Sequence, residues 1–183
     1  MRVYFDTGFF IDYFIERGHS RTLLRTADRR GRTTQKLCED AYTCVVKVGQ
    51  SHQGITSALT LVEAETTLFD ALQKVSADVP EKYRYMISAA RAQAVQVMTA
   101  VKLHSIQVYA LSEDVLKSVL TTLELQQYAI RAADAAHVAT AALAEADIII
   151  STDKQILGLD DKIKNRNGAL MRCVDTDDAI AML

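Results

Sequence analysis

The sequence predicts an α/β protein built on a parallel sheet of roughly five strands, with helices covering both faces. Short runs rich in β-branched and aromatic residues alternate with longer amphipathic stretches throughout the 183 residues. No tight-turn signal joins two of these short runs, so we expect helices to connect the strands, as they do in parallel sheets. No internal repeat or linker divides the chain, which predicts a single domain over residues 1–183.

The composition is that of a globular protein. Hydrophobic residues make up 49% and charged residues 24%, and one proline with seven glycines argues against a disordered chain. We expect neither a membrane span, because no run reaches about 18 apolar residues, nor a signal peptide, because Asp6 and Asp12 interrupt the first apolar stretch. Cys38, Cys44 and Cys173 lack disulfide-framework or metal-site spacing, so we expect free thiols and a cytoplasmic location.

The expected strands are short apolar runs bounded by polar residues. The run RVYF stops at Asp6, and the run III stops at Ser151. Continuous apolar runs of this length are typical of strands buried in a parallel sheet. The predicted strands cover residues 2–5, 54–58, 106–111, 148–150 and 170–174.

Helices are expected where apolar residues recur at intervals of three and four. Phe9 to Phe14 predict a first helix that ends near Gly18, and a second helix is expected to end at Gly49. Pro80 suits the first turn of a later helix, and residues 124–132 predict a loop or short turn. Further helices are predicted over residues 59–77, 81–103 and 112–123, from Asp134 onward, and over 155–159 and 177–183.

The segment of about residues 18–54 is basic in its first half. Residues 17–36 carry seven basic side chains against one acid, Asp28. A solvated surface explains such a run, and so does contact with the phosphates of a nucleic acid. The candidates for phosphate contact are Arg17, Arg21, Arg25, Arg29 and Arg30.

Three acidic residues follow predicted strands, and a fourth begins a helix. Asp6 directly follows the first strand, Glu63 follows the second by about a turn and a half of helix, and Asp153 follows the fourth. Asp134 opens the helix before the fourth strand, so its position at the same edge is the hardest to predict. Ligands of open parallel sheets bind at the carboxyl edge of the strands.

Each of these acids also has a structural explanation as a helix cap. Asp6, Asp134 and Asp153 are suitable N-cap residues, and the sequence TLVE fits a capping box that ends at Glu63. If that helix begins at Ser57 instead, Glu63 lies inside it. Four caps that converge on one edge are harder to explain than a shared cation, because clustered carboxylates repel one another unless positive charge neutralises them.

The ligand types favour Mg²⁺ or Mn²⁺ over Zn²⁺, because the candidates are carboxylates without cysteine or paired histidine. His137 has no companion at metal-site spacing, and we interpret it as a core histidine or a supporting residue one turn from Asp134. A cation of this kind activates water and neutralises charge in phosphodiester cleavage. The tripeptide DTG also occurs in aspartic proteases, but those are all-β proteins.

Four segments together resemble the PIN-domain ribonucleases, and among them the VapC-type toxins of bacterial and archaeal toxin–antitoxin pairs. They are VYFDTGFFID, SALTLVEAE, DAAHVATA and IISTDKQI, which occur in the family's order across nearly the whole chain. The resemblance implies a PIN-like three-layer α/β/α fold and an acidic quartet that is catalytic and binds Mg²⁺ or Mn²⁺. It assigns the quartet to Asp6, Glu63, Asp134 and Asp153, and supporting hydroxyls to Thr7 and Ser151.

The resemblance also implies an activity and partners. The chain would be a metal-dependent endoribonuclease that hydrolyses RNA with a metal-activated water, forms a homodimer and is inhibited by a cognate antitoxin protein. The basic candidates for phosphate contact would then hold the RNA backbone. Residues 18–54 form a longer segment than compact members have, and PIN folds also occur in RNA-processing nucleases outside toxin pairs. Two further hypotheses are a non-catalytic RNA- or protein-binding module and a phosphatase that acts on small phosphoesters.

Overall fold

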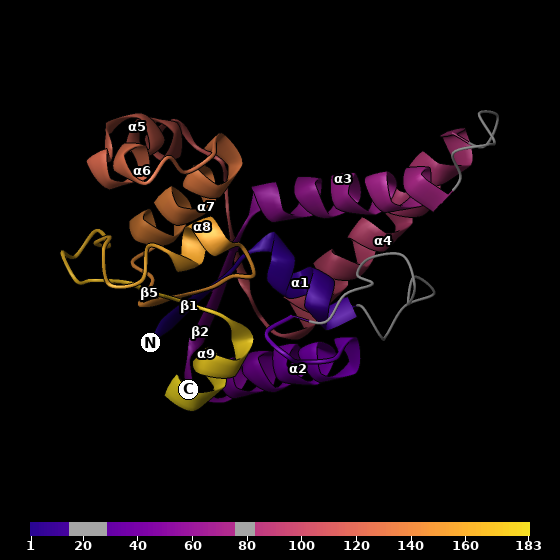
Figure 1. Cartoon of the computed structure of the whole chain (residues 1–183), viewed down its shortest axis with the longest axis horizontal. Coiled ribbons are helices and arrows are strands. Elements are labelled where there is room, and N and C mark those ends of the chain that lie inside the picture. The colour runs from indigo at the N-terminus through magenta and orange to yellow at the C-terminus, as the bar shows by residue number, and fades with distance from the viewer. Residues whose placement is uncertain (15–28, 76–82) are drawn as a thin grey trace.

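A five-stranded, all-parallel sheet forms the centre of the computed structural model, which describes residues 1–14, 29–75 and 83–183 (Figure 1). The strand order is β3-β2-β1-β4-β5, and each neighbouring pair is parallel. The prediction of a five-stranded parallel sheet is therefore confirmed. The strands are β1 (Arg2–Phe5), β2 (Gln53–Ser57), β3 (Gln107–Tyr109), β4 (Ile148–Ile150) and β5 (Arg172–Val174).

Helices connect these strands, and Figure 1 shows α3 and α4 side by side, extending away from the sheet. In the same view α5 and α6 lie beside α7, and α2 lies next to α9. The described helices are α1 (Thr7–Phe14), α2 (Thr34–Ser51), α3 (Ala58–Val75), α4 (Tyr83–Leu103), α5 (Glu113–Thr121), α6 (Leu123–Gln127), α7 (Ala132–Leu143), α8 (Lys154–Leu157) and α9 (Thr176–Met182).

Side chains that alternate along β1 pack into two different hydrophobic clusters. Val3 and Phe5 belong to a cluster that includes residues of α1, α2, α4 and α9. Tyr4 belongs to another cluster, which contains residues of α7 and α8. Because successive side chains of a strand point to opposite faces, helices cover both faces of the sheet, as predicted.

Several predicted boundaries differ from the structure. Strand β5 begins at Arg172, two residues later than predicted. Helix α2 continues through Gly49 to Ser51, because one glycine costs a helix only about 1 kcal/mol and Val45 and Val48 are buried in the core. Residues 123–127 form the short helix α6, where a loop or short turn was predicted over residues 124–132, and Leu125 anchors this helix in the core. Strand β3 is shorter than predicted, with only Gln107–Tyr109 in the ladder.

Other predictions have mixed outcomes. The three cysteines are free, as predicted, and the structure buries all three. The predicted helix end at Gly18 and the helix start at Pro80 lie outside the described residues. Much of the long 18–54 segment is helix α2, which packs against α1 and α9. Within the described ranges, no helix has the length and apolar character needed to cross a membrane.

Candidate active site

A cleft of about 380 Å³ at the carboxyl edge of the sheet contains all four predicted acids. Asp6 follows β1 and Asp153 follows β4, the two adjacent strands at which the chain changes direction across the sheet. This change of direction is the place where open α/β sheets bind ligands. Glu63 comes from α3 and Asp134 from the first turn of α7. The other residues that line the cleft are Thr7, Gly8, Ile11, Thr66, Thr67, His137 and Thr152.

The four carboxylates share one electrostatic environment. Burial raises the pKa of Asp134, and the negative charges of Asp153, Glu63 and Asp6 raise it further, while His137 opposes them. Burial also raises the pKa of Asp6, against the hydrogen bond from Ser151. The structure therefore places Asp134, whose position was hardest to predict, with the other three acids.

Asp6 is both a helix cap and part of the cleft. Its Oδ1 accepts a hydrogen bond from the backbone N–H of Phe9 at 2.8 Å, which caps α1. Its Oδ2 accepts a hydrogen bond from the hydroxyl of Ser151 at 2.5 Å. The side chain is almost completely buried. The cap and ligand interpretations of Asp6 are therefore compatible, since each carboxylate oxygen can accept more than one bond.

Glu63 lies inside α3, so the capping-box interpretation is wrong. The helix begins at Ala58, and the hydroxyl of Ser57 accepts a bond from the N–H of Thr60. Glu63 Oε2 accepts a 2.5 Å hydrogen bond from the Thr7 hydroxyl and lies 2.7 Å from Nε2 of His137. Burial by itself raises the pKa of Glu63, but the contacts with His137 and Thr7 outweigh it and lower the pKa overall.

The cap explanation holds for Asp153 and fails for Asp134. Asp153 is the N-cap of α8, where its Oδ1 accepts a 2.6 Å bond from the N–H of Gln155. The N-cap of α7 is Arg131, which makes no side-chain capping bond, and Asp134 lies in the first helical turn. An acid at this position interacts favourably with the helix dipole. Burial and the like charges of the cleft act in the opposite direction and raise the pKa of Asp134.

The hydroxyl groups predicted to support the acids contact them directly, and two further side chains join them. Thr7 donates to Glu63, and Ser151 donates to Asp6. His137 was interpreted as a core histidine or a supporting residue, and its contact with Glu63 agrees with the second interpretation. Tyr4 was missed: its hydroxyl lies 2.7 Å from Nδ1 of His137, and burial raises its pKa. The signal for Tyr4 is a tyrosine within a buried strand, since a buried hydroxyl usually requires a hydrogen-bond partner.

The loop after β4 approaches α1 closely at Gly8. A Cβ atom at this position would overlap the hydroxyl of Thr152, so a side chain here would force the Thr152 side chain to move. The same loop carries Ser151 and Asp153. Gly8 therefore allows these residues to lie beside Asp6.

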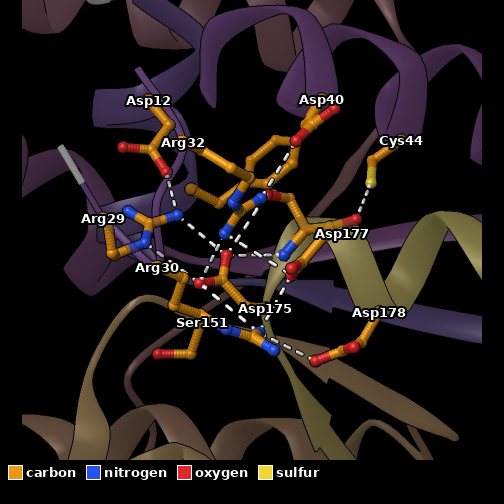
Figure 2. A network of polar contacts seen from close by, with 12 residues as sticks. Asp12, Arg29, Arg30, Arg32, Asp40, Cys44, Ser151, Asp175, Asp177 and Asp178 are labelled. Carbon is orange, nitrogen blue, oxygen red and sulfur yellow. Dashed lines mark hydrogen bonds and ion pairs between the residues drawn. The ribbon is translucent and has the colours of Figure 1, made fainter. Parts of the chain in front are cut away.

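The basic candidates are only partly described, and those described form ion pairs within the chain. Arg29 contacts Asp12 at 2.6 Å and Asp175 at 2.8 Å, and its side chain is 17% exposed. Arg30 contacts Asp178 at 2.8 Å and is more exposed. Figure 2 shows both guanidinium groups beside Asp175. A phosphate would have to compete with these carboxylates for Arg29 and Arg30. The candidates outside the described residues are Arg17, Arg21 and Arg25.

Cavity size alone does not identify the site. A larger hollow of about 670 Å³ lies at the opposite, amino edge of the sheet. Its acids are already paired, because the backbone N–H of Arg2 donates to Asp147 at 2.7 Å and the Arg2 guanidinium contacts Glu145 at 2.9 Å. The cleft at the carboxyl edge differs from this hollow because its four acidic residues lie together.

The carboxylates of the cleft do not converge tightly. Across residues 1–14, 29–75 and 83–183, no group of three or more His, Cys, Asp or Glu side chains is arranged to hold a metal ion. The donor set nevertheless suits a hard cation, because it consists of carboxylate and hydroxyl oxygens. Mg²⁺ usually keeps several waters and contacts only one or two protein carboxylates. The residues therefore fit a hydrated divalent cation better than a fully protein-ligated one.

Comparison of the chain with protein-family models, with curated proteins and with solved structures finds no match. The fold, the acidic cleft and the four sequence segments around it are therefore the features that indicate a function.

Proposed function

We propose that this protein is a Mg²⁺- or Mn²⁺-dependent endoribonuclease with a PIN-like three-layer fold. Its catalytic and metal-binding residues are Asp6, Glu63, Asp134 and Asp153. The observation that carries the proposal is the presence of all four acids in one cleft at the carboxyl edge of the sheet, far apart in the sequence but lining the same space. Like charges gathered in a partly buried cleft are costly unless a cation offsets them.

Each supporting residue has a task in this proposal. Thr7 holds Glu63 and Ser151 holds Asp6, so two carboxylates stay oriented while water and a phosphodiester enter the cleft. When bound, a divalent cation lowers the pKa of a bound water and neutralises charge on the phosphodiester. Water-mediated contacts from the remaining carboxylates are compatible with their spacing, because Mg²⁺ retains much of its hydration shell.

We propose RNA as the substrate because the four segments resemble those of PIN-domain ribonucleases. Two exposed basic residues, Arg131 and Lys154, adjoin the cleft acids in the sequence and would contact the RNA backbone. Arg17, Arg21 and Arg25 remain candidates for the same role. We further propose a cytoplasmic toxin that forms a homodimer and is controlled by a cognate antitoxin. An RNA-processing nuclease outside toxin pairs would use the same four acids.

The test is cleavage of defined, end-labelled RNAs by the purified protein with Mn²⁺, with Mg²⁺ or with a chelator. We expect internal cleavage that requires the metal and stops when the chelator is added. A small chromogenic phosphoester, assayed in parallel, should not be hydrolysed. Hydrolysis of that compound without RNA cleavage would indicate a phosphatase. Metal binding without any hydrolysis would indicate a binding module, and both results contradict the proposal.

A further inference from the structure

A buried tyrosine and histidine lie behind Glu63, on the side away from solvent. The Tyr4 hydroxyl is 2.7 Å from Nδ1 of His137, and Nε2 of the same ring is 2.7 Å from Glu63 Oε2. Tyr4 is fully buried and His137 is 2% exposed. The contacts therefore link the middle of β1, through α7, to a cleft residue on α3.

The donors and acceptors in this chain determine which ring nitrogen carries hydrogen. An ionised carboxylate only accepts hydrogen bonds, so Nε2 of His137 must donate to Glu63. In a neutral ring Nδ1 is then an acceptor, and the Tyr4 hydroxyl has a proton to donate to it. Glu63 therefore sets the tautomer of His137, and the Tyr4 hydroxyl, as a donor to Nδ1, favours the same tautomer. The Ser57 hydroxyl also lies 3.4 Å from Nδ1.

Both contacts to Glu63 end on the same carboxylate oxygen. Thr7 and His137 approach Oε2 from different elements, α1 and α7. Two donors on one oxygen restrict rotation of a flexible side chain and leave Oε1 for a ligand. A glutamate without them would lose rotamer freedom when it bound a cation.

We propose that His137, supported by Tyr4, is a positioning residue that orients Glu63 toward the bound cation. This inference rests on the proposed function, because it takes Glu63 as a cation ligand. Contacts behind a metal ligand typically change metal affinity about 10- to 100-fold when removed. In this proposal His137 does not itself contact the cation.

The experiment compares Tyr4→Phe, His137→Leu and His137→Gln with the wild type. We expect Mn²⁺ affinity, measured by titration calorimetry, to fall about 10- to 100-fold in His137→Leu. His137→Gln, which keeps an N–H donor, should recover part of the loss, and Tyr4→Phe should lose affinity while remaining folded. His52→Gln, at the amino edge of the sheet, is the matched control and should bind Mn²⁺ as the wild type does. Circular dichroism identifies folded variants.

A second measurement uses metal-free protein. Two-dimensional ¹H–¹⁵N spectra of the histidine rings should show His137 with hydrogen on Nε2 in the wild type, and a mixture of tautomers in Tyr4→Phe. Hydrogen on Nδ1 of the neutral wild-type ring would overturn the inference, as would wild-type Mn²⁺ affinity in folded Tyr4→Phe and His137→Leu. If the wild type binds no Mn²⁺, the proposed function fails, whereas the tautomer still tests the Tyr4–His137–Glu63 arrangement independently.

Discussion

Asp134→Asn is expected to reduce RNA cleavage at least about 100-fold while leaving the metal-free protein as stable as the wild type or more stable. Burial and three neighbouring acids raise the pKa of Asp134. A carboxyl whose pKa is raised in the folded state destabilises the protein; this penalty is complete above the raised pKa and is relieved as the pH falls through it. Asparagine removes the charge with little change in shape. Because Asp134 is only half-buried, the gain is small, roughly 1–3 °C in melting temperature.

The measurements for Asp134→Asn are the RNA cleavage rate with Mn²⁺ and thermal unfolding with a chelator present. Glu113→Gln provides the control, because Glu113 forms an exposed pair with Lys117 on α5. Exposed pairs contribute little to stability, so this variant should cleave and unfold as the wild type does. Cleavage near the wild-type rate by Asp134→Asn would remove Asp134 from the proposed mechanism. A large loss of stability in metal-free Asp134→Asn would contradict the proposed repulsion between Asp134 and the other three acids.

Asp175→Asn should produce the largest loss of stability, about 3–5 kcal/mol, or roughly 10 °C in melting temperature. Figure 2 shows Asp175 among three arginines. Its carboxylate has no solvent exposure and contacts Arg29 and Arg32, each at 2.8 Å. It also accepts a 2.7 Å bond from the N–H of Thr176 at the start of α9. Arg29 keeps Asp12 and Arg32 keeps Asp40, but each arginine loses one of its carboxylate partners inside the protein, and this loss explains the large effect.

The pH dependence of Asp175→Asn has a definite sign. Burial by itself raises the pKa of Asp175, but the contacts with Arg29 and Arg32 lower it overall. The stabilisation is therefore present above the ordinary pKa of an aspartate and is lost as the pH falls through the lowered value. Urea unfolding should show a gap between wild type and variant that narrows in acid. Asp178→Asn, which removes a largely exposed partner of Arg30, should cost less than about 1 kcal/mol. Equal stability of Asp175→Asn and wild type at neutral pH would contradict the role of the network.

The features that could be predicted from sequence are those encoded locally. The strands RVYF and III were predicted with the correct bounds, because continuous apolar runs end at polar residues. Asp6 and Asp153 were placed at the carboxyl edge because Asp6 directly follows one such run and Asp153 lies three residues after the other. The parallel arrangement followed from the helices between strands. These inferences need only the order of residues within a few turns of chain.

The features that could not be predicted depend on contacts between distant segments. The contact of His137 with Glu63 spans 74 residues, and that of Arg29 with Asp175 spans 146. The sequence around Arg29 suggests a solvated or phosphate-binding surface, because a local pattern cannot reveal distant carboxylates. Asp134 could not be placed with certainty because its position depends on how α7 packs against the sheet.

The most direct test of the central claim is the position of Mn²⁺ in crystals, located by its anomalous scattering. The account predicts a peak in the cleft among Asp6, Glu63, Asp134 and Asp153, with direct or water-mediated contacts to their carboxylates. Crystals of Asp134→Asn should show a weaker peak or none. A peak outside this cleft, for example beside Glu145 and Asp147, or no peak at saturating Mn²⁺, would contradict the account.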